Sequence, residues 1–442
     1  MKKILSFLII FFLVTSSAFA ESLQGTVEEQ RFLGLNDCLN IALEKNPVIT
    51  SAQKNSSAYK SRIEQAKAAY FPQLDFASGF QKQNPLTNSV NSFMNKSVTM
   101  YTLGQVSLTQ QIYDFGRTRS NIKVQKANYD YTLAENDDII DTVIFSVKDA
   151  YYYLLFTMHQ YNLSEEMVEK YNLQYQRAKA FYTIGTKPKL DVTSAELNLK
   201  DAKLNLLKAE NAVNIAVASL NNAMGEPFIN PYNLKDQLTF EDYDIDFEKA
   251  YELAKTHRPK LKIAKNRIKI ADESVKLAKK SYMPKLQGSA MYGKGGAKFN
   301  SDSGWNMGIY LELPVTNAYL VAKQVEEARA LYDKECAEAE KIKQDVYFEV
   351  QKSYYNLLES SKAIPVAEEG VKKAKENYDL ASGRYKVGFG DFIELKDAEV
   401  NYENSQLDYY RSLYSYNKSI AEFERVIGAS VDKTLKEKDE DI

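Results

Sequence analysis

The sequence contains few residues of the kinds that build disulfide scaffolds or metal centres. It has two cysteines, Cys38 and Cys336, and two histidines, His159 and His257, in 442 residues. Two cysteines so far apart do not make a disulfide framework, and neither histidine has a metal-binding neighbour at useful spacing. Both cysteines fall in helical patterns, so we expect them to be small buried residues. No cofactor or metal is predicted.

Enzyme motifs are also missing from the sequence. There is no nucleophile motif and no glycine-rich phosphate loop, and the carboxylates are spaced as on solvated helix faces. The formal net charge of −2 does not favour a nucleic-acid partner. The sequence therefore predicts neither an enzyme nor a nucleic-acid-binding protein.

The N-terminal segment 1–20 resembles a secretory signal peptide. Lys2 and Lys3 are followed by an apolar run over 4–14 and by the small residues of Ala18-Phe19-Ala20 before Glu21. After this segment, charges interrupt every apolar stretch. A mature chain that crosses a membrane would have to do so as a closed β-barrel, because lipid offers no partner to unpaired backbone groups.

An internal duplication is the strongest signal in the sequence. With a shift of 212 residues, Pro47 matches Pro259 and Pro72 matches Pro284. After an insertion near 84–97 the shift becomes 203, and it then holds for about a hundred residues. We expect a first repeat over 21–225, a linker over 226–245, a second repeat over 246–428 and a charged tail over 429–442.

Each repeat shows the same predicted order: a helical stretch, a β-hairpin, a very long helix and a return helix. In the first repeat these cover 35–69, about 72–113, about 117–183 and about 189–223. In the second they cover 246–281, about 284–315, about 320–387 and about 392–427. Pro365 falls inside the second long helix, where we expect a kink or a break.

The hairpin segments alternate between apolar and polar residues. Leu74, Phe76 and Phe80 share one face, and Trp305, Met307, Ile309, Leu311 and Leu313 share another. Val106 and Leu108 continue the first face after a bulge expected near Gly104. This pattern suits a half-buried soluble strand and also a membrane-barrel strand. Four strands cannot close a barrel, so a barrel would be shared: two chains supply about eight strands and three about twelve.

The return helices carry a seven-residue repeat, which predicts coiled-coil packing. Its large residues are Val192, Leu199, Leu206, Val213 and Leu220, with Leu395, Tyr402, Tyr409, Tyr416 and Phe423 in the second repeat. Small residues run beside them at Ala195, Ala202, Ala209 and Ala216, with Ala398, Ser405, Ser412 and Ser419 in the second repeat. We expect each return helix to pack on two neighbours in a wall of helices.

Several motifs together resemble the TolC-like family of outer-membrane efflux and secretion channels. They are the opening Leu35-Asn36-x-Cys38-Leu39-x-x-Ala42-Leu43-x-x-Asn46-Pro47, the prolines Pro72 and Pro284, and the turns Tyr182-Thr-Ile-Gly185-Thr and Tyr385-Lys-Val-Gly388-Phe. The resemblance covers nearly the whole mature chain. It implies a mixed, mainly α fold and a homotrimer. Such a trimer has a twelve-stranded β-barrel in the lipid of the outer membrane and a twelve-helix α-barrel in the periplasm. A periplasmic adaptor and an inner-membrane pump would be its partners.

The resemblance also suggests which residues carry function. The turns Ile184-Gly185-Thr186 and Val387-Gly388-Phe389 would contact the adaptor or pump, although glycine at a helix end also has a purely structural use. Asp191, Glu394 and Asp397 would form a ring of gate carboxylates, or would merely compensate helix dipoles. In a trimer such like charges would raise some pKa values or attract cations. Gly390 replaces a basic residue of the family's best-known member, so Lys187 or Lys189 would have to supply the closing link.

Two functions remain open at this point. The first is the outer-membrane exit duct of a tripartite efflux pump or a type I secretion system. The alternative is a soluble periplasmic coiled-coil scaffold, which would share the long helices but would not enter the outer membrane.

Overall fold

The computed structural model describes residues 31–83, 98–186, 188–226, 232–241, 243, 245–296, 302–313, 317–387, 389 and 392–429. The predicted signal peptide lies outside these ranges, as do the insertion near 84–97, Lys187, Gly388, Gly390 and the tail from 430 on.

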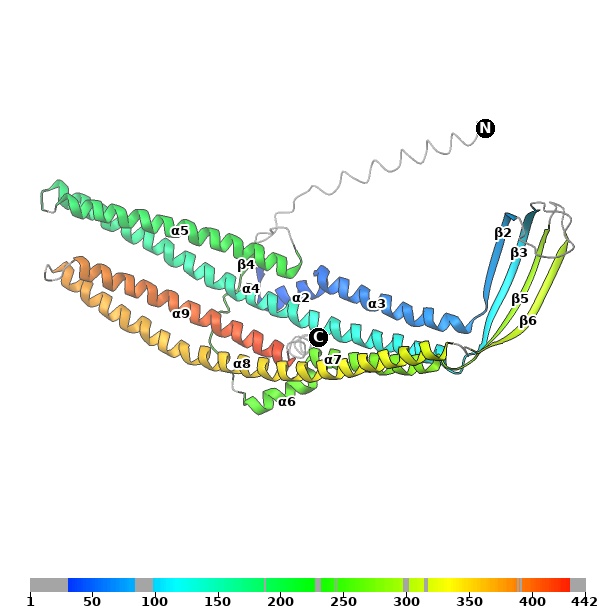
Figure 1. Cartoon of the computed structure of the whole chain (residues 1–442). Helices are drawn as coiled ribbons and strands as arrows, with labels where there is room; N and C mark the ends of the chain where they lie inside the picture. The colour runs from blue at the N-terminus through cyan, green and yellow to red at the C-terminus, as the bar shows by residue number, and fades with distance from the viewer. Residues whose placement is uncertain are drawn as a thin grey trace, which may run out of the picture.

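The two repeats contain the same elements in the same order (Figure 1). The first consists of β1 (Arg31–Leu33), α2 (Leu35–Lys45), α3 (Pro47–Lys67), η1 (Ala68–Tyr70), β2 (Gln73–Gln83), β3 (Val98–Tyr113), α4 (Arg117–Thr183) and α5 (Lys189–Met224). The second consists of β4 (Tyr232–Leu234), α6 (Phe247–His257), α7 (Pro259–Lys280), β5 (Lys285–Gly296), β6 (Ser303–Glu312), α8 (Ala318–Lys386) and α9 (Phe392–Ile427).

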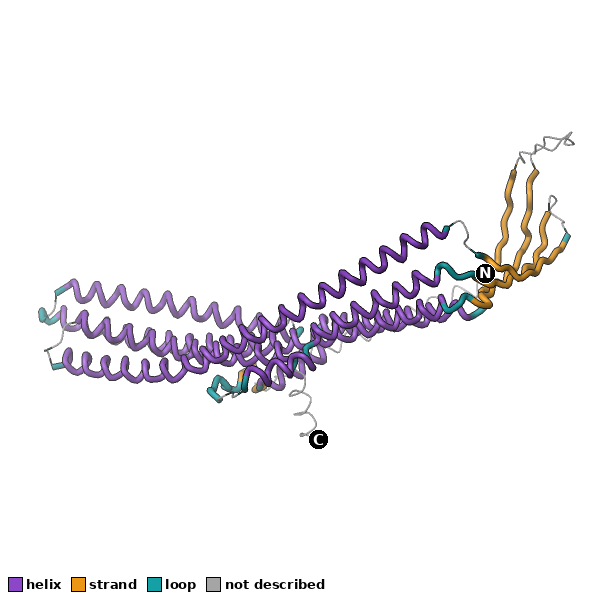
Figure 2. The backbone as a smooth tube through the Cα atoms, turned by 60° about the horizontal axis from the view of Figure 1, so that its bottom comes forward, coloured by secondary structure: helices purple, strands orange, loops and turns teal. Residues whose placement is uncertain are grey.

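The helices run together along one direction, with the four strands β2, β3, β5 and β6 at one end (Figures 1 and 2). At 67 and 69 residues, α4 and α8 extend through almost the whole helical part, each roughly 100 Å long at ~1.5 Å per residue. Near the strands the packing order is α3–α4–α7–α8, and towards the far end it is α5–α4–α9–α8. The chain therefore forms an open wall whose far half has α5 at one edge and α8 at the other.

Two expectations about helix boundaries were wrong. The opening helical stretch of each repeat is two helices, because Pro47 and Pro259 begin α3 and α7 at positions where a missing N–H costs nothing. In contrast, α8 continues unbroken through Pro365. Pro365 lies on the exposed face of α8, so water can reach the carbonyl that loses its helical hydrogen bond. Among the described residues, no helix has a segment apolar and long enough to cross a membrane.

The four strands form one antiparallel sheet in the order β2-β3-β5-β6. Apolar residues lie opposite one another across it: Leu74 pairs with Leu108, and Ala290 with Met307. Polar residues share the other face, where Gln111 pairs with Gln287. The predicted bulge is confirmed, since Leu103 and Gly104 of β3 together oppose one residue of β2. The sheet thus has one apolar and one polar face. In the described chain, its outer strands β2 and β6 each have a neighbour on one side only.

The seven-residue pattern of the return helices is the pattern of their burial. The alanine stripe of α5 is buried throughout, at Ala195, Ala202, Ala209 and Ala216. The expectation of two neighbours holds for α9, which packs on both α8 and α4. Within the described chain α5 packs along its length only on α4. The predicted burial of the cysteines is complete for Cys38 and partial for Cys336. Burial raises the pKa of the Cys38 thiol to about 12.

The two repeats close at matching joints near the middle of the wall. In the first, the side-chain amide of Asn46 donates to the carbonyl of Ala223 at the end of α5 (2.8 Å). In the second, Arg258 takes the matching position and its guanidinium donates to the carbonyl of Arg425 at the end of α9. Gly225 and Gly428 follow these helices with φ of 79° and 74°. A Cβ at either glycine would approach the backbone of the facing joint to 2.7 and 2.8 Å, respectively.

The linker between the repeats is tied to the long helices by tyrosine hydroxyls. Its strand β4 pairs with β1 in parallel, a contact that the sequence did not suggest. The Tyr151 hydroxyl of α4 donates to the carbonyl of Lys235 (2.7 Å), and that of Tyr416 in α9 donates to the carbonyl of Glu241 (2.5 Å). This belt connects the two repeats at the level of the hydrophobic core.

Candidate functional site

The two turns predicted as docking sites lie at the end of the wall that is farthest from the sheet (Figure 1). After α4, the N–H of Gly185 donates to the carbonyl of Tyr182 (3.0 Å) and that of Thr186 to Phe181 (3.0 Å), with Gly185 at φ 80°. This double bond to the last helical turn ends the helix in a left-handed conformation. The N–H of Phe389 makes the matching bond to the carbonyl of Arg384 (3.0 Å).

Large apolar side chains at this tip point into solvent in the single chain. Ile184 and Val387 are each 69% exposed and Phe389 is 84% exposed, and Leu190 and Ile393 beside them are also exposed. Exposed apolar side chains gathered at one end of a molecule mark a surface for a partner. Thr186 is not apolar, and its hydroxyl donates to the carbonyl of Phe181 (2.9 Å).

The three predicted gate carboxylates all lie near this tip but on two helices. Glu394 and Asp397 are exposed and three residues apart in the first turns of α9, so they share one face. Asp191 lies in the first turn of α5, in the other helical hairpin. The single chain therefore joins Glu394 to Asp397 on one face and leaves Asp191 on a separate element.

The expected basic partner was misplaced. Arg384, in the last turn of α8, forms an ion pair with Glu394 across the turn (3.0 Å). No ion pair joins Lys189 to any of the three carboxylates among the described residues, and Lys187 falls outside them. A signal for Arg384 was available in the sequence, because a cation in the last turn of one helix faces an acid in the first turn of the next.

A buried charged cluster that the sequence reasoning missed lies farther from the tip, where α4 meets α9. Lys170 forms an ion pair with Glu399 at 2.5 Å, and the Glu399 side chain is only 2% exposed. Gln174 donates a second bond to Glu399 (3.2 Å), and the Lys170 ammonium lies over the ring of Tyr378 (4.2 Å). Burial raises the pKa of the neighbouring Glu403 carboxyl, and the charge of Glu399 raises it further. The cluster holds the two repeats together just behind the candidate gate.

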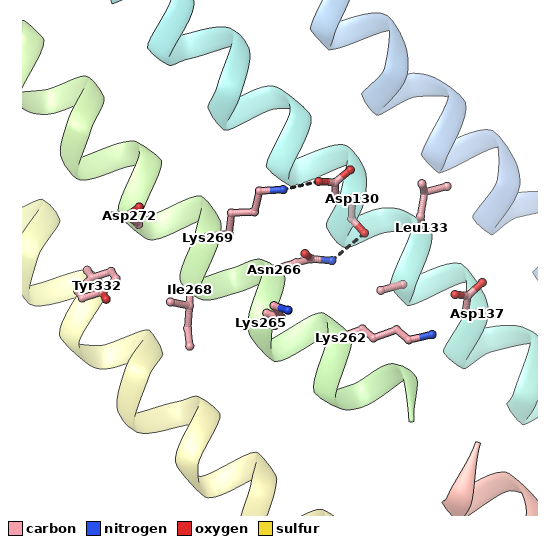
Figure 3. Close-up of a pocket in the computed structure, with 11 residues that line it drawn as sticks. Asp130, Leu133, Asp137, Lys262, Lys265, Asn266, Ile268, Lys269, Asp272 and Tyr332 are labelled. Carbon is pink, nitrogen blue, oxygen red and sulfur yellow. Dashed lines mark hydrogen bonds and ion pairs between the residues drawn. The ribbon is translucent and has the colours of Figure 1, made fainter. Parts of the chain in front are cut away.

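An open groove of about 710 Å³ separates α4 from α7 nearer the sheet (Figure 3). Its charges largely answer one another: Lys269 pairs with Asp130 (2.7 Å), and Asn266 donates to the carbonyl of Asp130 (2.9 Å). Burial raises the pKa of Asp137, while Lys262 opposes that shift. We interpret the groove as a seam between wall helices. Within the described ranges, no three side chains of His, Cys, Asp or Glu gather as metal ligands.

Comparison with known proteins agrees with this architecture. The probable efflux pump outer membrane protein TtgC of Pseudomonas putida is 21% identical over 379 residues, covering 83% of this chain and 77% of TtgC. The cation efflux system protein CusC of Escherichia coli is 24% identical over 184 residues, covering 41% of this chain and 39% of CusC. The crystal structure of the Campylobacter jejuni CmeC outer membrane channel superposes with a TM-score of 0.79 at 16% identity, covering 91% of this chain and 88% of CmeC.

The family model for outer membrane efflux proteins matches residues 38–226 and 250–429, one segment for each repeat. These segments include the joints, the sheet strands and both tip turns. The match decides between the two predicted functions in favour of the channel and against the soluble scaffold. The chain belongs to the outer membrane efflux protein family and is an outer-membrane transport channel.

Proposed function

We propose that this chain is the exit duct of a tripartite efflux pump or a type I secretion system, working as a homotrimer and carrying out no chemistry of its own. The observation that carries the proposal is the open sheet. Strands β2 and β6 are edges, and an unpaired edge in lipid leaves several backbone groups without partners. Three chains of four strands would close a barrel of about twelve, which is wide enough to leave a passage.

The faces of the sheet support the same assembly. The apolar face, with Phe76, Trp305 and Met307 each more than 70% exposed, would contact lipid. The polar face would line the passage. The helical wall is open in the same sense, since α5 and α8 are its edges. A ring closes when α8 of one copy meets α5 of the next.

The tip supplies the proposed partner surface and gate. The exposed apolar residues Ile184, Val387 and Phe389 would contact a periplasmic adaptor or the inner-membrane pump, together with Gly185, Thr186 and Gly388 of the same turns. Glu394 and Asp397 from three copies would place six carboxylates around the narrow end, with Asp191 behind them. The Arg384–Glu394 pair would help to hold the closed arrangement.

Conductance in planar bilayers tests the duct and the gate together. The purified protein should form ion-conducting pores and migrate as a trimer that is resistant to mild heating in detergent. Glu394→Ala combined with Asp397→Ala should raise single-channel conductance or reduce block by divalent cations, because the carboxylate ring is removed. Lys189→Ala is the matched control and should change neither. A protein that stays monomeric and leaves bilayers silent would refute the duct; unchanged conductance and block would refute the gate alone.

Cargo is tested in the cell. CusC is named for cation efflux and TtgC for an efflux pump. Deleting the gene should increase susceptibility to drugs or metal ions if the duct serves efflux, and should abolish export of a protein if it serves secretion. No change in either would contradict the proposal.

A further inference from the structure

The repeat symmetry of the chain pairs a closed contact with an open one. Within one chain, α4 of the first repeat packs on α9 of the second. The helices at the matching positions, 203 residues later for α4 and 203 residues earlier for α9, are α8 and α5. These two form the opposite edges of the wall and do not pack on each other in the described chain. A contact made once inside the chain is therefore available once more between chains.

The closed contact has an ionic and an apolar part. Its ionic part is the pair Lys170–Glu399 at 2.5 Å, with side chains 24% and 2% exposed. Its apolar part is Leu163 of α4, which is buried in a cluster that Leu407 of α9 packs against. Seven residues separate Leu163 from Lys170, and eight separate Glu399 from Leu407. The helices are antiparallel, so these spacings set the two parts side by side along the seam.

The open edges carry the same chemistry at the matching positions. Lys373 of α8 matches Lys170, and Glu196 of α5 matches Glu399, with identical residue types. Val366 matches Leu163 and Leu204 matches Leu407, and these two apolar residues are 73% and 50% exposed. Because the shift is constant, the spacings along each helix are also the same. Both edges thus present a lysine or a carboxylate beside an unburied aliphatic side chain.

Neither charge is committed elsewhere in the single chain. Glu196 is exposed and has no ion-pair partner among the described residues. Lys373 pairs with Glu376 one turn away in α8, where both side chains are at least 60% exposed (3.0 Å). An exposed pair within one helix contributes little to stability, so Lys373 can leave it for a less solvated partner.

We propose that neighbouring copies join α8 of one to α5 of the next in the register of the α4–α9 contact. The Lys373 ammonium then bonds the Glu196 carboxylate of the adjacent copy, and Val366 packs on Leu204. The proposal rests on the trimer proposed above and specifies its helical interface. The ring then alternates a contact within a chain and a matching contact between chains, so that every long helix meets the same chemistry.

Charge reversal in the full-length protein tests the pair. Lys373→Glu alone and Glu196→Lys alone each place like charges at the seam and should shift the equilibrium towards monomer by roughly tenfold or more. The double reversal restores opposite charges and should recover most of the trimer, measured by native mass spectrometry and by heat dissociation in detergent. Lys372→Glu is the matched control, because Lys372 is the adjacent exposed lysine of α8 (76%). It should leave the trimer unchanged.

A second measurement does not depend on stability. With Cys38 and Cys336 replaced by serine, Lys373→Cys together with Glu196→Cys should give covalent dimers and trimers on mild oxidation, and either cysteine alone should not. A trimer that resists both single reversals and fails to cross-link overturns the proposed register and leaves the trimer standing. A wild-type protein that never trimerises refutes the duct itself. A double reversal as weak as the sum of the two single reversals also overturns the pair.

Discussion

The two repeats contain the same elements but lie in different surroundings, and the surroundings decide what each residue does. Glu196 and Glu399 are the same residue at the same position of α5 and α9, yet the first is exposed and the second is 2% exposed. The difference arises because α9 is covered by α4 whereas α5 is an edge. Residue type alone therefore does not reveal whether a carboxylate in this chain is a solvated surface group or a buried anchor.

The joints show the same lesson in reverse. Asn46 and Arg258 differ in size and charge but do one job, since each caps the last turn of its return helix. The Arg258 side chain is fully buried, and its guanidinium also pairs with Glu349 (3.3 Å). Burial and the nearby Arg425 lower the pKa of Arg258. The second joint thus depends on a buried charge and the first on a neutral amide.

Removing the two caps should separate the repeats most strongly. Arg258→Ala takes away a buried guanidinium and leaves the end of α9 uncapped and a cavity behind, which should lower the free energy of unfolding by about 3–5 kcal/mol. Asn46→Ala should lower it by only about 1–2 kcal/mol. The measurement is urea unfolding of the purified protein in detergent, followed by circular dichroism. Equal losses would mean that the charge at the second joint is immaterial.

Replacing the joint glycines should instead make the repeats look alike. Gly225→Ala and Gly428→Ala each add a Cβ at positive φ within 3 Å of facing backbone. Strain and overpacking together should cost about 2–3 kcal/mol at either site. The same unfolding experiment applies, with Gly370→Ala as a control because nothing lies within 4 Å of a Cβ there. A loss at one joint only would show that the close approach is not shared.

Pro365→Asn should erase a difference between the long helices. Asn162 occupies the matching position of α4, where the helical hydrogen bond is intact. Restoring an N–H in α8 should raise the free energy of unfolding by about 2 kcal/mol, since proline is about 3 kcal/mol worse than alanine in a helix interior. The reverse change, Asn162→Pro, should destabilise. No gain from Pro365→Asn would mean that α8 needs its curvature there.

The smallest expected effect concerns pH at the buried cluster. The folded state raises the pKa of Glu403. A carboxyl whose pKa is raised on folding contributes a penalty that is absent below its ordinary pKa of about 4.3 and grows as pH rises through the folded value. Glu403→Gln should therefore stabilise by about 1 kcal/mol or less at pH 7.5 and not at pH 4. Glu210→Gln, an exposed carboxylate of α5, is the control. A gain that is equal at both pH values would contradict this account.

Much of the fold could be predicted from the sequence because it rests on local periodicity. The alternation around Leu74 and Met307 predicted strands with two unlike faces, and the register confirms them. The heptads of the return helices predicted the buried alanine stripe of α5. The family and the outer-membrane channel function were also predicted and are confirmed. The gate carboxylates and docking turns stay predictions.

What failed were judgements that depend on solvent and on neighbours. A break was expected at Pro365 because proline removes one hydrogen bond, but an exposed carbonyl can bond water, so α8 continues. Arg384 was overlooked as the partner of Glu394 because the pairing crosses a turn whose geometry only the structure supplies.

By itself, the sequence determined the duplication, the faces of the strands and the seam of the return helices, because each is written in the spacing of residues along one segment. Only the tertiary structure decided which matching residue is buried, which helix is an edge and which base meets which acid. Those outcomes depend on which segments become neighbours, and two nearly identical repeats cannot both occupy the middle of an open wall.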